Sequence, residues 1–501
     1  MNKNITAEIM LRVVVFVCGA VVMILELAAS RIIAPYLGTS IVVWTGLIGI
    51  ILGSLSLGYW WGGKIADKNA NYKRLGIILA ISAVLTALIS YFKPVLSLIQ
   101  NIDSLEFGAI LSTLILFAPA TVVLGMVTPY AVRLAIRSID DSGKTVGNLY
   151  AISTLGSIIG TFLGGFFLIS IFGNARIISI LSITLALCSL FIFLIENTNH
   201  KRTYLLFLIF LAPLLFPAPG LLLHSGDILV TDVDTRYNRM WVIDRIDKET
   251  KRPARYITNT TEVTQSGMFI DNPTELLFKY AKFFDYAEYF RPNFNSSLMI
   301  GAGAYSYPKH YLDKFSDATM DVVEIDPIMT DIARRYFALK DSPKLNIFHE
   351  DGRTFLNKNT KKYDLVFMDA FLSYWAIPYQ LTTEEAVQRI YSGLNDDGVA
   401  FVNMISGIEG PAGSFFRAEY ATYAKIFPQL YVFKVNQSVA PDKIQNLVLV
   451  ATKYKNKPAF LKTKDSNDIL SNLWIKKIVT DISPLNDDFA PVEYLNSRAF
   501  F

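Results

Sequence analysis

Four short apolar segments between residues 298 and 371 each end in residue types that can hold a nucleoside. In chain order they read LMIGAGAYSYP, MDVVEIDP, LNIFHEDGRTFL and YDLVFMDAF. Glycines let the backbone approach a ligand where a strand turns into a helix, and an acid ending the next strand can accept hydrogen bonds from ribose hydroxyls. The residues concerned are Gly301, Gly303, Glu324, Asp351 with Gly352, and Asp369. Together they predict an adenosine-type ligand of the S-adenosylmethionine kind.

Each of these residues also has an ordinary structural explanation. A glycine at a tight turn can relieve steric strain, Glu324 can pair with a lysine, and Asp351 before Gly352 can cap a turn. The occurrence of all four segments in this order favours nucleoside binding over these explanations.

The segments that position these residues alternate between strand and helix. We expect strands at 297–301, 320–325, 345–349, 364–369, 398–405, 431–435 and 446–452. This alternation predicts a mostly parallel sheet covered by helices on both faces, with ligands at the carboxyl ends of the strands. Upstream, period-two stretches from about residue 227 predict a small β-subdomain, and Asn272 with Pro273 is expected to begin a helix.

The first part of the chain is far more apolar than the remainder. The 501 residues are 52% hydrophobic, and before about residue 224 the apolar residues form long uninterrupted runs. Because about 20 apolar residues cross ~30 Å of hydrocarbon, we expect seven transmembrane helices. Their ranges are about 9–29, 41–63, 74–92, 108–130, 148–172, 174–195 and 203–223. The first is too long for a cleaved signal peptide and should stay in the mature protein.

Small residues and one acid stand out inside these spans. Glu26 lies within the first span, where a charge is costly; it either bonds to a neighbouring helix, is protonated, or serves a polar substrate or proton. Glycines four apart allow close helix packing. They recur in the second span (Gly49, Gly53, Gly58, Gly62) and in the fifth (Gly156, Gly160, Gly164).

Basic residues gather in alternate loops, after spans two, four and six. By the positive-inside rule these loops are cytoplasmic, and seven spans would then place the C-terminal half outside. Adenosine-type methionine derivatives are cytosolic, however, and the proline-rich stretch TYLLFLIFLAPLLFPAPGLLL can form a re-entrant element instead of a span. We therefore expect a multi-pass membrane protein with a cytoplasmic C-terminal domain.

The remaining composition argues against several classes of site. The two cysteines, Cys18 and Cys188, both fall in spans, and the four histidines show no ligand spacing, so no metal site is expected. The net charge is +4, and no basic block with interleaved aromatics suggests nucleic acid.

The soluble half resembles the polyamine aminopropyltransferase (spermidine synthase) family, and the whole chain resembles its membrane-bound branch. In the membrane half the resemblance is carried by LELAASRIIAPYLG and GNLYAISTLGSIIGTFLGGF. In the soluble half it is carried by TRYN, TEVTQSGMFIDNPTELLFKYAKF, the four nucleoside segments, IPYQLTTEE and LNDDFAPVE. It implies a transmembrane helical domain at 1–223, a β-subdomain at 224–270 and a Rossmann-like α/β transferase domain at 271–501.

The resemblance also implies roles for individual residues. Glu324 matches the acid that holds the ribose hydroxyls, and Asp351 matches the acid near the adenine amine. Asp369 matches the catalytic carboxylate, while Tyr237 and Gln265 match an active-site tyrosine and glutamine. The implied co-substrate is decarboxylated S-adenosylmethionine or S-adenosylmethionine itself, without a metal. The expected partners are a small amine and the lipid bilayer, with a homo-oligomer left open.

Two departures from the family pattern argue against free putrescine as the acceptor. Ala304 stands where spermidine synthases carry the Asp that grips the donor's ammonium group, and residues 370–373 lack the Asp that grips the polyamine. A buried cation without its anion is expensive. Aromatic residues follow instead and could hold an acceptor or form a lid or packing surface: Phe371, Tyr374, Trp375 and Tyr379.

Two alternatives to aminopropyl transfer remain open from the sequence. One is methyl transfer from S-adenosylmethionine, because Ala304 removes an anchor specific to the decarboxylated donor. The other is a transporter or sensor whose soluble domain binds a nucleoside or polyamine without chemistry, since GGKIADK resembles a loop of major-facilitator transporters.

Overall fold

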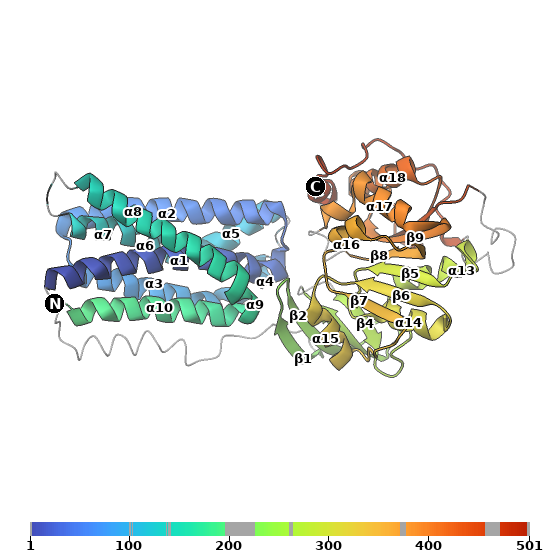
Figure 1. Cartoon of the computed structure of the whole chain (residues 1–501), viewed down its shortest axis with the longest axis horizontal. Coiled ribbons are helices and arrows are strands. Elements are labelled where there is room, and N and C mark those ends of the chain that lie inside the picture. Colours follow the sequence, from blue (N-terminus) through green and yellow to red (C-terminus); the bar gives the residue numbers. More distant parts are fainter. Residues whose placement is uncertain are drawn as a thin grey trace. The chain divides into compact units, whose positions relative to one another are not determined.

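The structure is a computed structural model that describes residues 3–99, 102, 104–136, 138, 142–195, 226–259, 264–370, 377–455 and 471–497. They divide into two compact units. The first contains the helices up to α10 together with Val233–Arg239, and the second contains the two sheets and their helices. In Figure 1 the first unit is coloured blue to green, and the second runs from green to red.

Among the described residues, six helices of the first unit are long and apolar enough to cross a membrane. They fall in α1 (Lys3–Leu37), α2 (Ile41–Asn69), α3 (Tyr72–Phe92), α6 (Ala118–Gly125) with α7 (Val127–Ala135), α8 (Ser142–Phe162) with the π-helical η2 (Leu163–Leu168), and α10 (Asn174–Ile195). Shorter elements are η1 (Lys93–Val95), α4 (Leu96–Ile99), α5 (Leu105–Leu116) and α9 (Ile169–Ile171).

Six of the seven predicted spans coincide with these helices, and the stretch 203–223 lies outside the described residues. The span predicted at 108–130 is broken into α5, α6 and α7. Pro119 and Pro129 fall in the first turns of α6 and α7. Because proline lacks a backbone N–H and clashes with the preceding turn, it is tolerated at a helix start and interrupts a longer helix.

Close helix packing at the spaced glycines is confirmed for some positions and wrong for others. A Cβ on Gly58 would lie 2.1 Å from the carbonyl oxygen of Val122 in α6, and one on Gly156 would lie 2.0 Å from that of Phe16 in α1. Gly49 has nothing within 4 Å of such a Cβ, and the same is true of Gly53. The glycines therefore fix the α2–α6 and α1–α8 contacts over part of the helix length only.

Glu26 is partly buried in α1. The described residues offer its carboxylate no hydrogen bond or ion pair, so the predicted bond to a neighbouring helix is not found among them.

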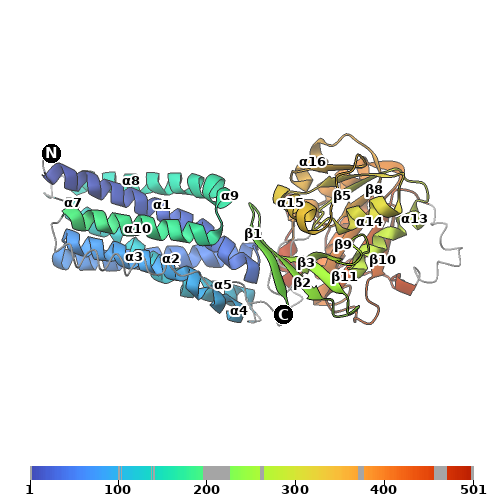
Figure 2. The ribbon, with the colours of Figure 1, turned by 90° about the horizontal axis from the view of Figure 1, so that it is seen from below.

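The second unit contains a four-stranded and a seven-stranded sheet (Figure 2). The smaller has the order β1-β2-β3-β4, with β1 (Ile228–Asp234), β2 (Arg239–Ile246), β3 (Pro253–Thr258) and β4 (Thr264–Phe269). The larger has the order β10-β11-β9-β8-β5-β6-β7. Its strands are β5 (Ser296–Ile300), β6 (Thr319–Val323), β7 (Leu345–Phe348), β8 (Tyr363–Met368), β9 (Leu394–Ser406), β10 (Gln429–Lys434) and β11 (Gln445–Thr452).

Strands β5 to β9 pair in parallel, and β9, β11 and β10 pair antiparallel at one edge. All seven predicted strands of this sheet are present. The antiparallel edge was not anticipated, because alternation of strand and helix carries no sign of a closing hairpin.

Helices cover both faces of the larger sheet, as β5 illustrates. Leu298 and Ile300 pack into a core with α16 (Gly352–Lys358), α17 (Glu384–Gly393) and α18 (Ser414–Ile426). The intervening Met299 packs into a second, aromatic-rich core with α14 (Ser306–Lys314) and α15 (Pro327–Tyr336). A strand that is buried on both faces has a continuous apolar run in its sequence, and this explains the run Leu298–Ile300 of β5.

The helix predicted to begin at Asn272 and Pro273 is wrong. Residues 272–278 form turns, and the helical segment is divided into α12 (Lys279–Lys282), η3 (Phe283–Tyr286) and α13 (Ala287–Phe290). Arg252 binds the carboxylates of Asp271 at 2.8 Å and Glu275 at 2.9 Å. These ion pairs hold the chain in a turn where an isolated sequence pattern favours a helix.

Candidate active site

The loop after β5 is shaped for close approach to a ligand. Gly301 and Gly303 have φ values of 83° and 52°, in the left-handed region that favours glycine. A Cβ on Gly301 would lie 2.3 Å from the carbonyl oxygen of Asp369, and one on Gly303 would lie 3.0 Å from the Cβ of Ser266 in β4. The loop thus lies between the end of β8 and the smaller sheet, and only glycine fits at Gly301.

Glu324 follows β6 directly and is 8% exposed. Its carboxylate accepts hydrogen bonds from the backbone N–H groups of Ala302 (3.1 Å) and Asp326 (3.0 Å). Burial raises the pKa of Glu324 to about 7, although these hydrogen bonds act in the opposite direction. The structure therefore brings this acid to the glycine loop, as the sequence predicted, and holds it at the end of its strand.

Asp351 and Gly352 lie at the start of α16, after β7. The carboxylate of Asp351 caps this helix by accepting a hydrogen bond from the backbone N–H of Thr354 at 2.9 Å. A Cβ on Gly352 would lie 2.7 Å from Ile300 at the end of β5. Asp351 therefore caps a helix, as its structural explanation predicted. It also lies at the carboxyl edge of the sheet, and its contact with an adenine stays a prediction.

Asp369 follows β8 and is held by two side chains from other elements. The phenol of Tyr280 in α12 donates a hydrogen bond to its Oδ2 at 3.0 Å, and the amide of Asn403 in β9 donates one to its Oδ1 at 2.9 Å. The amide of Asn446 in β11 donates in turn to Asn403 at 3.2 Å. Burial raises the pKa of Asp369 to about 6, while the two hydrogen bonds lower it. A carboxylate so placed is ionised near neutral pH and can still accept a proton.

Tyr280 and Asn403 were not identified from the sequence. Tyr280 lies in the segment whose helix start was mispredicted, so its direction could not be inferred. Asn403 could have been noticed, because it is the single polar residue in the apolar strand stretch VAFVNMI; it is 3% exposed. A buried amide normally requires a hydrogen-bonding partner, which is here Asp369.

Gln265 and Tyr237 come from the smaller sheet and its first hairpin. Gln265 lies in β4, beside the Ser266 that faces the glycine loop, and its Oε1 is buried with no hydrogen-bond partner among the described residues. Tyr237 lies between β1 and β2, in the segment Val233–Arg239 that groups with the helical unit, and is 42% exposed. The role predicted for Tyr237 stays a prediction.

The residues present fit a nucleoside with a sulfonium or amino tail. Gly301 and Gly303 form a cradle that a Cβ would fill, and Ser266 of β4 lies beside it. Glu324 and Asp369 supply carboxylates at the ends of β6 and β8, the two strands that flank β5. Of the aromatic segment predicted beside the site, Phe371, Tyr374 and Trp375 lie outside the described residues. The remaining aromatic residue, Tyr379, is 54% exposed.

This part of the chain is similar in sequence to known proteins. Residues 298–455 match the family described as spermine/spermidine synthase domain. A polyamine aminopropyltransferase of Vibrio vulnificus is 32% identical over 151 residues, covering 30% of this chain and 48% of that protein. An eEF1A lysine and N-terminal methyltransferase of Bos taurus is 26% identical over 152 residues, covering 28% of this chain and 21% of that protein.

Part of the chain is similar to solved structures at a low level. The crystal structure of a probable spermidine synthase from Corynebacterium glutamicum has a TM-score of 0.44 and 16% sequence identity. It covers 54% of this chain and 99% of that one. The chain spans about half the length of the Vibrio relative that it matches, 48%. Residues 298–455 of this chain are thus similar to the family described as spermine/spermidine synthase domain.

Proposed function

We propose that this protein is a membrane-embedded transferase that moves an alkyl group, aminopropyl, from an S-adenosylmethionine-type donor to an amine acceptor other than free putrescine. The observation that carries the proposal is Asp369, a buried carboxylate at a strand end beside the glycine loop, held by Tyr280 and Asn403. The relatives that support it are polyamine aminopropyltransferases by name.

The chemistry asks little more of the protein than alignment and one proton acceptor. The donor supplies a carbon next to a sulfonium, and an uncharged amine attacks that carbon as the carbon–sulfur bond breaks. The sulfur keeps the electron pair and leaves as a neutral thioether, so no acid is needed. The amine loses a proton, which the carboxylate of Asp369 can accept. The remainder of the rate enhancement comes from holding the amine at ~3–3.5 Å from the carbon.

The two Asp residues that bind ammonium groups in the family pattern are absent at residue 304 and at 370–373. We therefore expect this protein to select its donor and its acceptor differently from a spermidine synthase. Ala304 is fully buried, so this position offers only a methyl group where that family has an Asp. If the donor still carries an aminopropyl group, its ammonium must be held by acceptors other than residue 304.

We predict that the full chain in detergent binds decarboxylated S-adenosylmethionine more tightly than S-adenosylmethionine. A thermal-shift titration with each donor measures this directly. The larger shift with the decarboxylated donor is expected because its tail lacks the carboxylate that would approach the ionised Asp369. A larger shift with S-adenosylmethionine would favour methyl transfer, the activity named for the bovine relative.

We also place the soluble domain in the cytoplasm, where such donors are formed. The proposal rests on where the donor is found. The segment Val233–Arg239, which leads into β2, contacts Arg31 near the end of α1 and Asn174 at the start of α10. That end of the helical unit is opposite the basic loops, which the positive-inside rule places in the cytoplasm.

A reporter fused after Phe501 tests this placement. Green fluorescent protein should fluoresce and alkaline phosphatase should be inactive, because the first folds in the cytoplasm and the second only outside it. Active phosphatase with no fluorescence would put the domain outside and would mean that the stretch 203–223 crosses the membrane.

A further inference from the structure

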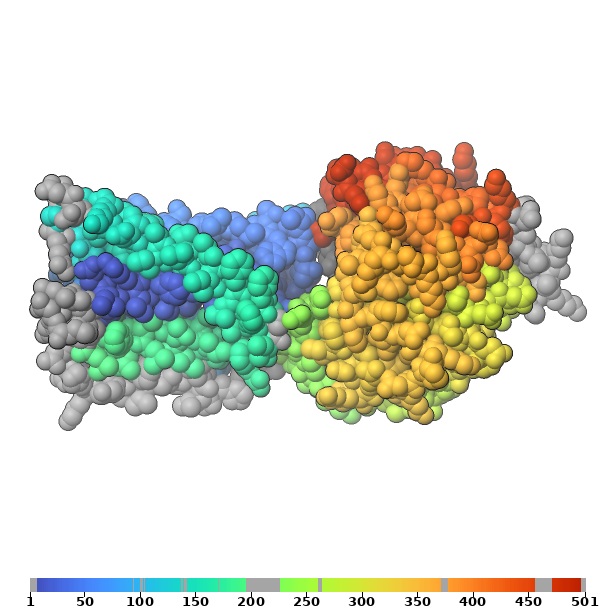
Figure 3. Space-filling model, in the orientation of Figure 1, coloured from blue at the N-terminus to red at the C-terminus, as the bar shows by residue number. Residues whose placement is uncertain are grey.

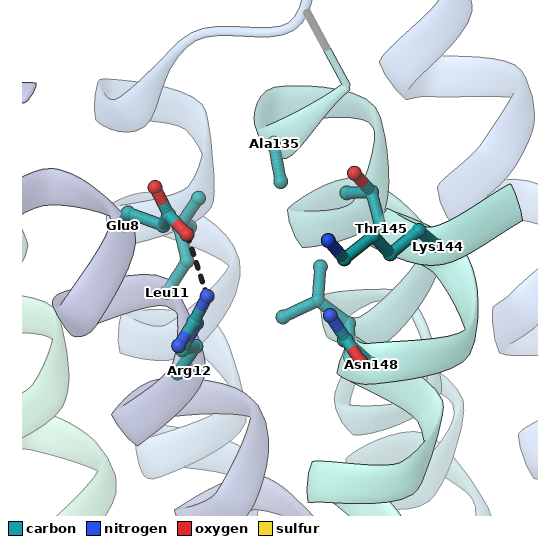
Figure 4. Close-up of a pocket in the computed structure, with 8 residues that line it drawn as sticks. Glu8, Leu11, Arg12, Ala135, Lys144, Thr145 and Asn148 are labelled. Carbon is teal, nitrogen blue, oxygen red and sulfur yellow. Dashed lines mark hydrogen bonds and ion pairs between the residues drawn. The ribbon is translucent and has the colours of Figure 1, made fainter. Parts of the chain in front are cut away.

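The helical unit contains a polar cavity that the proposed reaction does not use. It has a volume of about 300 Å³ and lies between the first turns of α1, the end of α7 and the first turns of α8 (Figure 4). Its polar lining comes from two helices: Glu8 and Arg12 from α1, and Lys144, Thr145 and Asn148 from α8. Chain order places it at the end of the bundle that carries the basic loops.

The cavity has an excess of positive charge. Arg12 pairs with Glu8 at 2.6 Å within one turn of α1. Lys144 faces them from α8 in Figure 4 and has no hydrogen bond or ion pair with the described residues. Two cations against one carboxylate give the lining a net charge of +1. Lys144 also lies in the first turn of the 21-residue α8, where the free backbone N–H groups add to the positive potential. These groups select an anion.

The surroundings of the cavity are apolar, which points to a lipid. Leu11 and Leu149 line it and are 1% and 4% exposed. Beyond it, α8, which is coloured teal in Figure 3, exposes large apolar side chains. These are Tyr150, Leu155, Ile158, Ile159 and Phe162, all 44–54% exposed. In a helix long enough to cross a membrane such a surface contacts acyl chains, so a polar group at its end lies at the depth of lipid head groups.

We propose that this cavity binds the phosphodiester of an anionic phospholipid head group. Arg12 and Lys144 flank the phosphate, and the amide of Asn148 and the hydroxyl of Thr145 donate hydrogen bonds to its oxygens. The bound lipid joins the first turns of α1 and α8, whose contact further along the helices depends on Gly156 and Gly160. The site would be filled whether or not the soluble domain is an aminopropyltransferase.

Native mass spectrometry of the full chain, released from detergent, tests the site with three probes: phosphatidylglycerol, phosphatidylcholine and inorganic phosphate. We expect one phosphatidylglycerol to be retained in preference to phosphatidylcholine. Lys144→Ala should weaken its binding roughly fivefold, the effect of one basic residue near an anionic head group. Lys144→Arg should retain it, because the charge is kept. Lys68→Ala, which removes an exposed lysine outside the cavity, is the matched control and should bind as the wild type does.

Several results would overturn the proposal. Equal retention of phosphatidylcholine would show that the charge does not select the ligand. Unchanged binding in Lys144→Ala, or an equal loss in Lys68→Ala, would show that the anion binds elsewhere on the basic surface. Displacement of phosphatidylglycerol by inorganic phosphate at equal concentration would assign the cavity to a free anion. A Lys144→Arg variant that loses the lipid would equally contradict a charge-based site.

Discussion

Replacing Asp369 by Asn is expected to lower kcat by ~10²- to 10⁴-fold, the range that a positioned proton acceptor contributes, while donor affinity is unchanged. The substitution keeps the shape of the side chain. Asn can accept the hydrogen bond from Asn403 and donate one to the Tyr280 oxygen, so the two contacts of Asp369 can persist. What is lost is the capacity to take the amine's proton. Steady-state rates of thioether nucleoside release, with calorimetry for the donor, separate the two effects.

The pH dependence supplies a second readout of the same residue. The pKa of Asp369 is about 6, so kcat/KM should fall as the pH drops below that value and the carboxylate becomes protonated. Tyr280→Phe removes a hydrogen bond that lowers this pKa. The acidic limb should then move to higher pH, which a merely structural role of Tyr280 would not produce. A D369N variant with normal kcat, or an acidic limb unmoved in Tyr280→Phe, would contradict the assignment.

Replacing Glu324 by Gln is expected to weaken donor binding by ~10- to 100-fold, because hydrogen bonds to a charged group contribute ~1.5–3 kcal/mol. The ribose hydroxyls would donate to the ionised carboxylate. Its pKa is raised to about 7, so the ionised fraction grows as the pH rises through that value. Donor affinity of the wild type should therefore be higher at pH 8 than at pH 6. Isothermal calorimetry at both values measures the constant and its pH dependence.

The Gln variant should lose this pH dependence as well as affinity. Asp341→Asn is the matched control, because it removes a carboxylate of the same domain that is 80% exposed and pairs with Arg334 on the surface. Its donor affinity should equal that of the wild type at both pH values. If Glu324→Gln bound the donor normally, or kept the wild-type change between pH 6 and pH 8, Glu324 would not hold the ribose.

The strand ends of the candidate site could be predicted because each depends on local sequence. An apolar run that ends in glycine or acid marks both the strand and its carboxyl end, and the parallel order of β5, β6 and β8 follows from the intervening helices. Glu324 and Asp369 lie on either side of the glycine loop after β5 for this reason. The glycine loop was predicted on the same basis, and its positive φ angles explain the residue type at Gly301 and Gly303.

The groups that hold Asp369 could not be predicted in the same way. Tyr280 and Asn403 are separated from it by 89 and 34 residues, and their contact depends on how α12 and β9 pack on β8. The prediction of a helix start near residue 272 failed because ion pairs of Arg252 with Asp271 and Glu275 hold the chain in a turn there. Such contacts bring together residues far apart in the sequence, and the periodicity of a single segment cannot predict them.

The identity of the thioether nucleoside released during turnover tests the central claim most directly. The full chain in detergent would be incubated with a panel of primary amines and each donor, and the products identified by mass spectrometry. We predict methylthioadenosine together with an amine heavier by one aminopropyl group, both formed ~10²- to 10⁴-fold more slowly by the D369N variant. Release of S-adenosylhomocysteine with a methylated product, or methylthioadenosine release that D369N leaves unchanged, would contradict the account.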